Sequence, residues 1–278
     1  MKKIAICGYS SAAGKYFVEK YKNEFQYVLI GRRRPDIYLD LSDVTSIANP
    51  EKLLGCDVII NFAADTNCST DEEIINLIKA NVVGPVFLAQ LAVKYNVPRL
   101  IHISSISATY NPDDSYYGYY AESKRSADNF LELYCKQNSL SYCILRPSSL
   151  FGTDDFAKHQ KFLYTLIDKV KNNEDIQIYG KLDAKRNYLH VDTLSEMVYR
   201  LIDSYVVGIF DAVNCVNDKV SEIVDALNIY YGGHSKISFL EDKPDIIETN
   251  FDSDNTLYDL LSVQRTRGIK GELSEKQK

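Results

Sequence analysis

Short apolar runs alternate with longer segments of helical periodicity through the first half of this chain of 278 residues. The apolar runs have the length of buried strands, and each interval between them is long enough for a helix. This alternation is typical of strand–helix–strand units that build a parallel sheet. We predict strands at residues 4–7, 27–30, 58–62, 100–103 and 141–145, and helices at 14–21, 71–95 and 119–137. Together they predict an α/β fold with a Rossmann-type, doubly wound parallel sheet.

The pattern becomes irregular after Gly152. Helical periodicity at about 159–171, around 193–203 and from 220 is interspersed with apolar runs at 176–179 and 209–213. Such a remainder suits a smaller lobe at the carboxyl edge of the sheet, where open α/β sheets bind ligands. The predicted organisation is a cofactor-binding domain (1–152, with 186–215 returning to it), a C-terminal substrate lobe (153–185 and 216–264) and a flexible polar tail (265–278).

Composition excludes several classes of partner. A formal net charge of -6 provides no basic field for a phosphate backbone, so we expect no nucleic acid partner. The six cysteines include no C-x-x-C pair, which argues against a zinc site and a disulfide framework and favours reduced thiols in a cytoplasm. The first apolar run is about four residues, against 7–15 in a signal peptide, and no apolar segment approaches the roughly 18 residues of a membrane span. We therefore expect a soluble cytoplasmic protein with neither metal nor membrane partner.

A glycine-containing turn follows the first predicted strand. Gly8-Tyr-Ser-Ser-Ala-Ala-Gly14 stands between that strand and a helix, where glycines allow a tight turn and bring a pyrophosphate to the amino end of the helix. Ser11 occupies the place of a middle glycine, which restricts the backbone, although its hydroxyl can donate to a phosphate. A simple strand–helix turn is the alternative interpretation.

Three arginines follow the second predicted strand, in Gly31-Arg32-Arg33-Arg34. An NAD-selective site has an acidic residue there for the ribose 2′-hydroxyl, whereas NADP selection needs cations. Guanidinium groups match phosphate oxygens in pairs and keep their charge. Arg32 and Arg33 therefore favour NADP(H), with a solvated basic turn as the alternative.

A tyrosine and a lysine are spaced for acid–base chemistry in Tyr120-Ala-Glu-Ser-Lys124. A separation of four places both side chains on one face of a helix. A tyrosine hydroxyl has a pKa near 10, and a neighbouring ammonium group favours the phenolate. With 21 tyrosines in the chain, the motif taken alone also fits chance.

Read in order, eight segments resemble the extended short-chain dehydrogenase/reductase family, the NAD(P)-dependent epimerase/dehydratase group. They are Gly8-Tyr-Ser-Ser-Ala-Ala-Gly14, Asp40-Leu-Ser-Asp43, Asn61-Phe-Ala-Ala64, Ala80-Asn-Val-Val-Gly84, Ile103-Ser-Ser105, Tyr120-x-x-Ser-Lys124, Leu145-Arg-Pro-Ser-Ser-Leu-Phe-Gly152 and Arg186-Asn-Tyr-Leu-His-Val-Asp192. The resemblance covers residues 2–215 and continues more loosely to about 261. It implies a homodimer that pairs through the helices at 71–95 and 119–137.

The resemblance implies a role for each matching residue. Ser105 would supply a catalytic hydroxyl and Tyr120 the acid, while Lys124 would tune the tyrosine and hold the nicotinamide ribose. The cofactor-binding residues expected from the resemblance and the arginine turn together are Gly8, Ser10, Ser11, Ala12, Gly14, Arg32, Arg33, Asp40, Leu41, Phe62, Ala63, Ala64, Asn81, Ser104, Tyr120, Lys124, Pro147 and Ser148. The expected substrate-binding residues are Thr66, Ser107, Ser149 and Arg186, of which Arg186 would contact a diphosphate.

The chain departs from the family pattern where the substrate is expected. Ser149 replaces the usual asparagine, and a serine segment one residue longer than usual leaves Ser107 as an alternative to Ser105. The chain is also shorter than many nucleotide-sugar epimerases, and a late arginine that completes the diphosphate clamp is not evident. We expect His102 and His190 to be structural.

The predicted function is NADPH-dependent reduction of a keto group on a nucleotide-linked deoxysugar, as in the synthesis of cell-surface polysaccharide precursors. Net reductases consume reduced cofactor and more often use NADPH, so the arginines favour reduction over a 4-epimerase that retains NAD. NAD(H) remains possible as the cofactor. A third alternative is a binding protein that senses NADP(H) without turnover, but such proteins typically lose the tyrosine or the lysine, and this chain has both.

Overall fold

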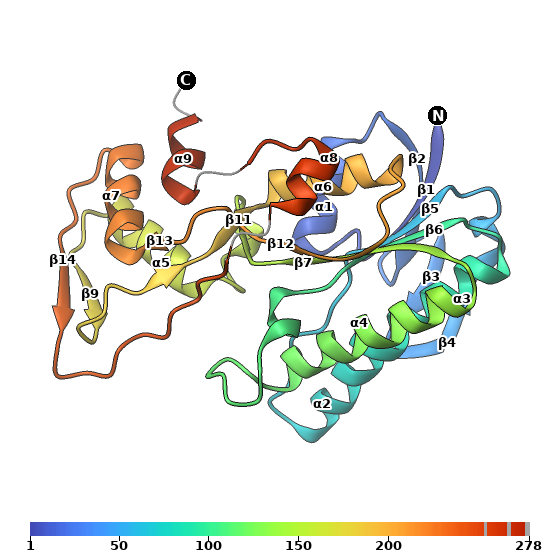
Figure 1. Ribbon diagram of the computed structural model, residues 1–278, viewed down its shortest axis with the longest axis horizontal. Coiled ribbons are helices and arrows are strands. Elements are labelled where there is room, and N and C mark those ends of the chain that lie inside the picture. The colour runs from blue at the N-terminus through green and yellow to red at the C-terminus, as the bar shows by residue number, and fades with distance from the viewer. Residues whose placement is uncertain (253–254, 266–267, 276–278) are drawn as a thin grey trace. The chain divides into compact units, whose positions relative to one another are not determined.

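The structure is a computed structural model that describes residues 1–252, 255–265 and 268–275 (Figure 1). The chain divides into two compact units, each treated separately below. Unit 1 comprises residues 1–147 and 195–211, and unit 2 comprises residues 148–194 and 212–278. The segment that returns to the first unit is shorter than the predicted 186–215.

Unit 1 contains an eight-stranded sheet with the order β12-β7-β6-β5-β1-β2-β3-β4. Its strands are β1 (Lys2–Cys7), β2 (Phe25–Gly31), β3 (Ile37–Asp40), β4 (Asp43–Ala48), β5 (Val58–Asn61), β6 (Arg99–Ile103), β7 (Ser141–Pro147) and β12 (Gly208–Ala212). The neighbouring strands β7-β6-β5-β1-β2-β3 all pair in parallel. β4 pairs with β3 in the antiparallel direction and forms one edge of the sheet. The chain runs outward from β1 through β2 to β3, then returns to β5 beside β1 and runs outward the other way. This reversal confirms the doubly wound fold and places the switch point, where such sheets bind ligands, between β1 and β5.

Helices cover both faces of this sheet (Figure 1). They are α1 (Ala12–Lys20), α2 (Asp71–Ile78), α3 (Gly84–Lys94), α4 (Tyr119–Gln137) and α6 (Val191–Ile202), of which α6 begins in unit 2. α2, α3 and α4 lie on one face, and α1 and α6 on the other, where Tyr21 stacks on Tyr199 with ring centroids 4.5 Å apart. Short 3-10 turns occur at Pro50–Leu53 and Ile106–Thr109.

The predicted helix at 71–95 is one continuous helical run, because the π-helical turn Lys79–Val83 joins α2 to α3. Thr70 caps its start in a capping box with Glu73. The run Asp71–Lys94 is long and apolar enough to cross a membrane by length and composition, so the expectation that no segment approaches a membrane span was wrong. In unit 1 its buried side chains, including Leu77 and Leu88, are part of the protein core.

Unit 2 is built from short strands and helices around its own apolar core. Its strands are β8 (Ser149–Phe151), β9 (Ile176–Tyr179), β10 (Lys185–Arg186), β11 (Tyr188–His190), β13 (Asp218–Lys219) and β14 (Ile237–Leu240). Its helices are α5 (Lys161–Lys171), α7 (Val220–Tyr231), α8 (Thr256–Leu261) and α9 (Gly268–Glu275), with a 3-10 turn at Asp154–Phe156. β8 pairs with β11, β9 with β14, and β10 with β13.

The C-terminal segment differs from the flexible tail predicted over 265–278. Residues Gly268–Glu275 form α9, whose Ile269 is buried in the core of unit 2. The Ile269 amide donates to the Asp218 carboxylate at 2.8 Å, which caps the helix amino end. The polar sequence predicted fraying, but Ile269 and Leu273 pack against the core of unit 2, and together with the Asp218 carboxylate they order the helix. Residues 266–267 and 276–278 of the predicted tail lie outside the described part of the chain.

Candidate active site

The glycine turn packs tightly against the end of β5. Gly8 has a φ of +79°, and a Cβ there would lie 2.4 Å from the Ala63 amide nitrogen. A Cβ on Gly14 would lie 2.3 Å from the Gly8 carbonyl oxygen. Side chains at either position would therefore push the turn away from the switch point of the sheet.

Ser11 has a defined local role in this turn. Its hydroxyl oxygen accepts a hydrogen bond from the Gly14 amide at 3.1 Å and caps α1. The amides of Ala12 and Ala13 have no acceptor among the residues that the structure describes. Two unpaired N–H groups at a helix amino end fit an anion such as a diphosphate. The exposed Ser10 lies beside them. The turn therefore fits the cofactor expected from the sequence.

Residues beyond the turn differ in what they can offer a cofactor. Phe62 packs on Phe17 with ring centroids 5.6 Å apart, so its side chain belongs to the core, and its amide donates to the Cys7 carbonyl at 2.8 Å. Ala63 is partly exposed and Ala64 is exposed at the exit of β5. Leu41 is buried under Gly84, where a Cβ would meet it at 3.0 Å.

The arginine turn lies at the end of β2, as predicted. Arg32 Nη1 lies 3.3 Å from an Asp40 carboxylate oxygen, with 69% of the arginine side chain exposed. Burial raises the pKa of Asp40, but hydrogen bonds from Ser42 and the charge of Arg32 outweigh it and hold this pKa below its usual value. Within the described part of the chain, Arg33 makes no ion pair, so cations are available at the position that discriminates NADP from NAD.

Tyr120 and Lys124 lie one turn apart on α4, as the spacing predicted. Lys124 is 1% exposed, and its ammonium donates to the Ile103 carbonyl at 3.2 Å. Lys124 Nζ lies 5.8 Å from the centroid of the Tyr120 ring. The end of β6 and the first turns of α4 thus hold both groups together.

Burial dominates the protonation of this pair. Burial lowers the pKa of Lys124 to about 8, although the Asp128 carboxylate opposes the change. Burial raises the pKa of Tyr120, Asp128 raises it further, and a hydrogen bond with Ser105 lowers it. The expectation that the ammonium lowers the tyrosine pKa is therefore not met in this structure, because desolvation of the phenolate is the larger effect. Tyr120 keeps its proton at neutral pH, as a proton donor must.

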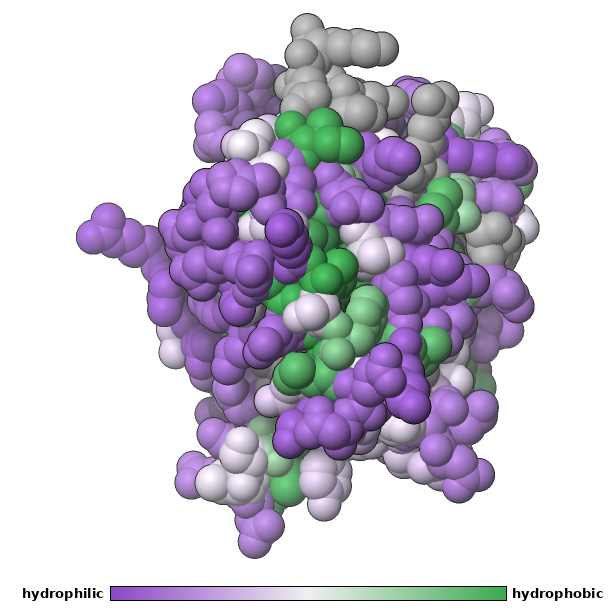
Figure 2. Space-filling model, turned by 90° about the vertical axis from the view of Figure 1, so that its left-hand side faces the viewer, coloured by the Kyte–Doolittle hydropathy of each residue, from purple (hydrophilic) through white to green (hydrophobic). Residues whose placement is uncertain are grey.

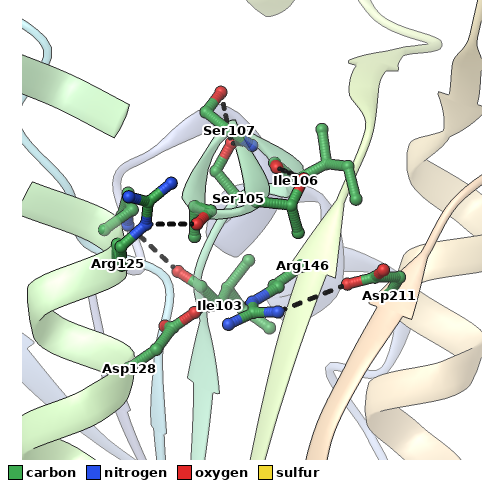
Figure 3. A network of polar contacts seen from close by, with 11 residues as sticks. Ile103, Ser105, Ile106, Ser107, Arg125, Asp128, Arg146 and Asp211 are labelled. Atoms are coloured by element: carbon green, nitrogen blue, oxygen red, sulfur yellow. Dashed lines mark hydrogen bonds and ion pairs between the residues drawn. The ribbon is translucent and has the colours of Figure 1, made fainter. Parts of the chain in front are cut away.

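The structure distinguishes the two candidate serines. Ser105 lies close enough to the Tyr120 hydroxyl for hydrogen bonding to lower the tyrosine pKa, and it caps the 3-10 turn Ile106–Thr109. Ser107 lies next to Ser105, and their two hydroxyl oxygens are hydrogen-bonded at 3.1 Å (Figure 3). Ser105 is thus in contact with the tyrosine, and Ser107 contacts Ser105. The neighbouring Ser104 is buried, and its amide donates to the Leu145 carbonyl at 2.7 Å.

A buried ion pair that sequence reasoning missed lies one turn beyond Lys124. Asp128 is fully buried, and Arg146 Nε donates to its carboxylate at 2.7 Å. Arg146 also reaches Asp211 at 3.8 Å (Figure 3). The spacing of four between Lys124 and Asp128 was the available signal, but it does not reveal that Arg146 on β7 faces them.

Asn81 also ties the site together from the π-helical turn. Its side-chain oxygen accepts from the Asp65 amide at 2.7 Å, and its side-chain nitrogen donates to the Asp65 carbonyl at 2.8 Å and to Ser123 at 3.0 Å. It joins the loop after β5 to α4 rather than presenting a free amide. Thr66, on the same loop, is exposed.

The two histidines expected to be structural, His102 and His190, are buried. His102 Nδ1 pairs with the Asn61 amide at 3.1 Å, but its Nε2 has no partner among the described residues, so this histidine is only half satisfied. Burial lowers its pKa well below the usual value, so it is neutral. His190 packs edge-on against Phe151 and accepts from the Asp192 amide at 3.1 Å.

Unit 2 and the end of unit 1 hold the remaining predicted residues. Pro147 and Ser148 are buried, and the Ser148 hydroxyl has no partner in the described chain. Ser149 begins β8. Arg186 is 8% exposed, with its guanidinium carbon 5.0 Å from the centroid of the Phe162 ring. A cavity of about 150 Å³ elsewhere in unit 2, between α5, α7 and α9, is lined by none of the predicted site residues.

The model of the NAD-dependent epimerase/dehydratase family matches residues 4–215 of the chain. The chain belongs to this family. That membership confirms the resemblance to extended short-chain dehydrogenases/reductases. Among residues 1–252, 255–265 and 268–275, no three His, Cys, Asp or Glu side chains lie close enough together to hold a metal ion.

Curated relatives in this family are distant. The chain is 25% identical over 154 residues to a putative UDP-glucose 4-epimerase of Methanocaldococcus jannaschii, which covers 50% of each chain. It is 24% identical over 192 residues to a dTDP-glucose 4,6-dehydratase of Mycolicibacterium smegmatis, covering 62% of this chain and 55% of that one. It is 22% identical over 254 residues to Protein CapI of Staphylococcus aureus, covering 80% of this chain and 74% of that one. The chain spans about half the length of the first two relatives.

Solved structures of epimerase/dehydratase-type proteins share the fold along almost the whole chain. A UDP-N-acetylglucosamine 4-epimerase from Methanobrevibacter ruminantium M1 superposes with a TM-score of 0.79 at 18% identity, covering 99% of this chain and 95% of that one. A UDP-glucuronic acid 4-epimerase from Bacillus cereus, in complex with UDP-glucuronic acid and NAD, has a TM-score of 0.77 at 16% identity, covering 98% and 96%.

Proposed function

We propose that this protein is an NADPH-dependent oxidoreductase that reduces a keto group on a nucleotide-linked deoxysugar. The observation that carries the proposal is the contact of Ser105 with Tyr120 and the position of Lys124 one helical turn later. These groups supply a hydroxyl donor, a protonated phenol and a buried cation in one place.

In this proposal the cofactor supplies a hydride. The chain's own residues handle the proton and the developing charge. Tyr120 donates its proton to the oxygen of the keto group, and the Ser105 hydroxyl stabilises the negative charge that develops there. Lys124 carries positive charge at neutral pH, because its pKa of about 8 lies above 7, and so it stabilises the phenolate that remains.

Net reduction with NADPH is favoured by the arginine turn. Arg32 is exposed at the end of β2, and Arg33 has no ion-pair partner in the described chain, so both guanidinium groups can bind a 2′-phosphate. Arg186, which lies against Phe162 in unit 2, is the candidate for the diphosphate of the substrate.

The proposal is tested by turnover of NADPH with a nucleotide-linked 4-keto-deoxysugar. Tyr120→Phe should lower kcat about 10²- to 10⁴-fold and leave NADPH binding intact, because the ring remains and only the proton donor is lost. Tyr119→Phe is the matched control, since Tyr119 is adjacent on α4 and 57% exposed. A Tyr120→Phe variant with full turnover would refute the mechanism.

A 4-epimerase that retains NAD is the second candidate. The curated and structural relatives named above include 4-epimerases, one of them in complex with NAD, which favours this alternative. Denaturing the purified protein and assaying the released nucleotide separates the two candidates. Stoichiometric NAD(H), together with sugar interconversion without net cofactor consumption, would favour the epimerase.

We also propose a homodimer that pairs through α2 and α4. Ile75 and Ile78 on α2 are 54% and 46% exposed, and Phe130 and Leu133 on α4 are 57% and 52% exposed. Apolar side chains spaced at three residues on neighbouring helices form a face suited to a second copy. Light scattering should give twice the chain mass for the wild type and the mass of one chain for Phe130→Glu.

A further inference from the structure

Tyr9 connects the glycine turn with the arginine turn. It is the second residue of the Gly8-to-Gly14 segment, and its ring lies against the backbone of Gly31 at the end of β2. A Cβ on Gly31 would lie only 3.2 Å from Tyr9 Cε1, so the ring occupies the space that a side chain at position 31 would need.

The Tyr9 hydroxyl donates a hydrogen bond to the Arg33 carbonyl oxygen. The far side of the same turn is held by Asp36, whose amide donates to the Leu29 carbonyl at 2.9 Å and whose carboxylate accepts from the Leu29 amide at 2.9 Å. The segment 32–34 is therefore fastened at one side by Tyr9 and at the other by Asp36.

The side chains on this fastened turn point to an anionic ligand. Arg32 contacts Asp40 at 3.3 Å, and within the described residues Arg33 and Arg34 make no ion pair. Arg34 has a φ of +51°, a left-handed conformation that is uncommon for a non-glycine residue. Ordering a cationic turn before the ligand arrives reduces the entropy lost on binding.

We propose that Tyr9 is a positioning residue that holds the arginine turn in the form that binds the 2′-phosphate, and so helps this protein select NADP(H) over NAD(H). The inference rests on the NADP(H) preference in the proposed function. Tyr9 acts through its hydrogen bond to the Arg33 backbone, so its contribution to binding of the 2′-phosphate is indirect. Gly31 belongs to the same arrangement, because a methyl group at position 31 would displace the Tyr9 ring.

The experiment measures dissociation constants for NADPH, NADH and 2′,5′-ADP by fluorescence and calorimetry, without turnover. One hydrogen bond of this kind changes an equilibrium by a factor of about 2 to 12. Tyr9→Phe should weaken NADPH and 2′,5′-ADP binding by up to about that factor and leave NADH binding unchanged. Gly31→Ala should act in the same direction.

The matched control is Tyr27→Phe. The Tyr27 hydroxyl also donates to a backbone carbonyl of unit 1, that of Tyr21, at 2.8 Å. This variant should keep the NADPH-to-NADH ratio of the wild type, and melting curves of all variants establish that they are folded. An unchanged ratio in folded Tyr9→Phe and Gly31→Ala, with a lowered ratio in Arg32→Ala, overturns the role of Tyr9 and leaves the proposed cofactor intact. A wild type without NADPH preference, unaffected by Arg32→Ala, overturns both.

Discussion

Replacing Lys124 with methionine should stabilise the protein while removing its activity. The ammonium of Lys124 is 1% exposed, and its pKa falls from 10.5 to about 8 because burial disfavours the charged form. One pKa unit corresponds to about 1.36 kcal/mol, so holding this charge inside the fold at pH 7 opposes folding by roughly 3 kcal/mol. Methionine has a similar length and no charge to bury.

The net gain is smaller than the electrostatic figure. The variant loses the hydrogen bond from Lys124 to the Ile103 carbonyl, which contributes about 1 kcal/mol. We therefore expect the free energy of unfolding to rise by about 2 kcal/mol, and Tm by about 4–8 °C. Lys136→Met is the matched control on the same helix, because Lys136 is 62% exposed, and it should change stability by less than about 0.5 kcal/mol.

The pH dependence gives an independent measure of the same effect. The folded-state pKa of Lys124 lies below its unfolded-state pKa, so between pH 8 and 10.5 the unfolded chain binds more protons. This group therefore makes stability rise with pH across that window, by up to about 1.36 kcal/mol per pH unit, and contributes no slope below it. Urea unfolding of wild type and variant at several pH values should show their difference shrinking as the pH rises from 8. A Lys124→Met variant less stable than the wild type at pH 7 would refute the reasoning.

Three further variants test the packing around the site. Asp128→Asn leaves the Arg146 guanidinium without its buried counter-charge and should lower stability by about 3 kcal/mol in urea unfolding, whereas Glu132→Gln, one turn along α4, should change it little. Gly14→Ala should abolish cofactor binding in a calorimetric titration, since its Cβ would lie 2.3 Å from a carbonyl oxygen of the turn; an unchanged affinity would contradict the tight turn. Thr70→Ala removes the α2 cap and should lower Tm by an amount equivalent to about 1 kcal/mol, while Thr70→Ser should retain most of the stability.

The fold could be predicted where hydrophobic periodicity was long and regular. Five of the parallel strands, β1, β2, β5, β6 and β7, and the helices between them show the apolar periodicity of their type, because each element must bury one face against a neighbour. The four-residue strand β3 was not predicted. The short strands of unit 2, such as β10 and β13, have too few residues to show any period, and they form because distant segments pair. α9 was missed for the same reason, since its order depends on the contact of its first residues with Asp218.

The residue types of the site followed from order and spacing along the chain. Tyr120 and Lys124 meet because four residues make about one helical turn, and the arginines reach the edge of the sheet because they follow a strand. Local sequence is sufficient for these features, since each depends on neighbours within a few positions.

Protonation and long-range contacts depend on what the fold buries. The pKa of Tyr120 is raised because its surroundings exclude water, and the sequence pattern does not predict how deeply the side chain is buried. Likewise, Ser105 rather than Ser107 meets Tyr120, and Arg146 meets Asp128, because β6, β7 and α4 pack together from separate parts of the chain. Local spacing thus accounts for which groups the site contains, while tertiary packing sets their charges and partners.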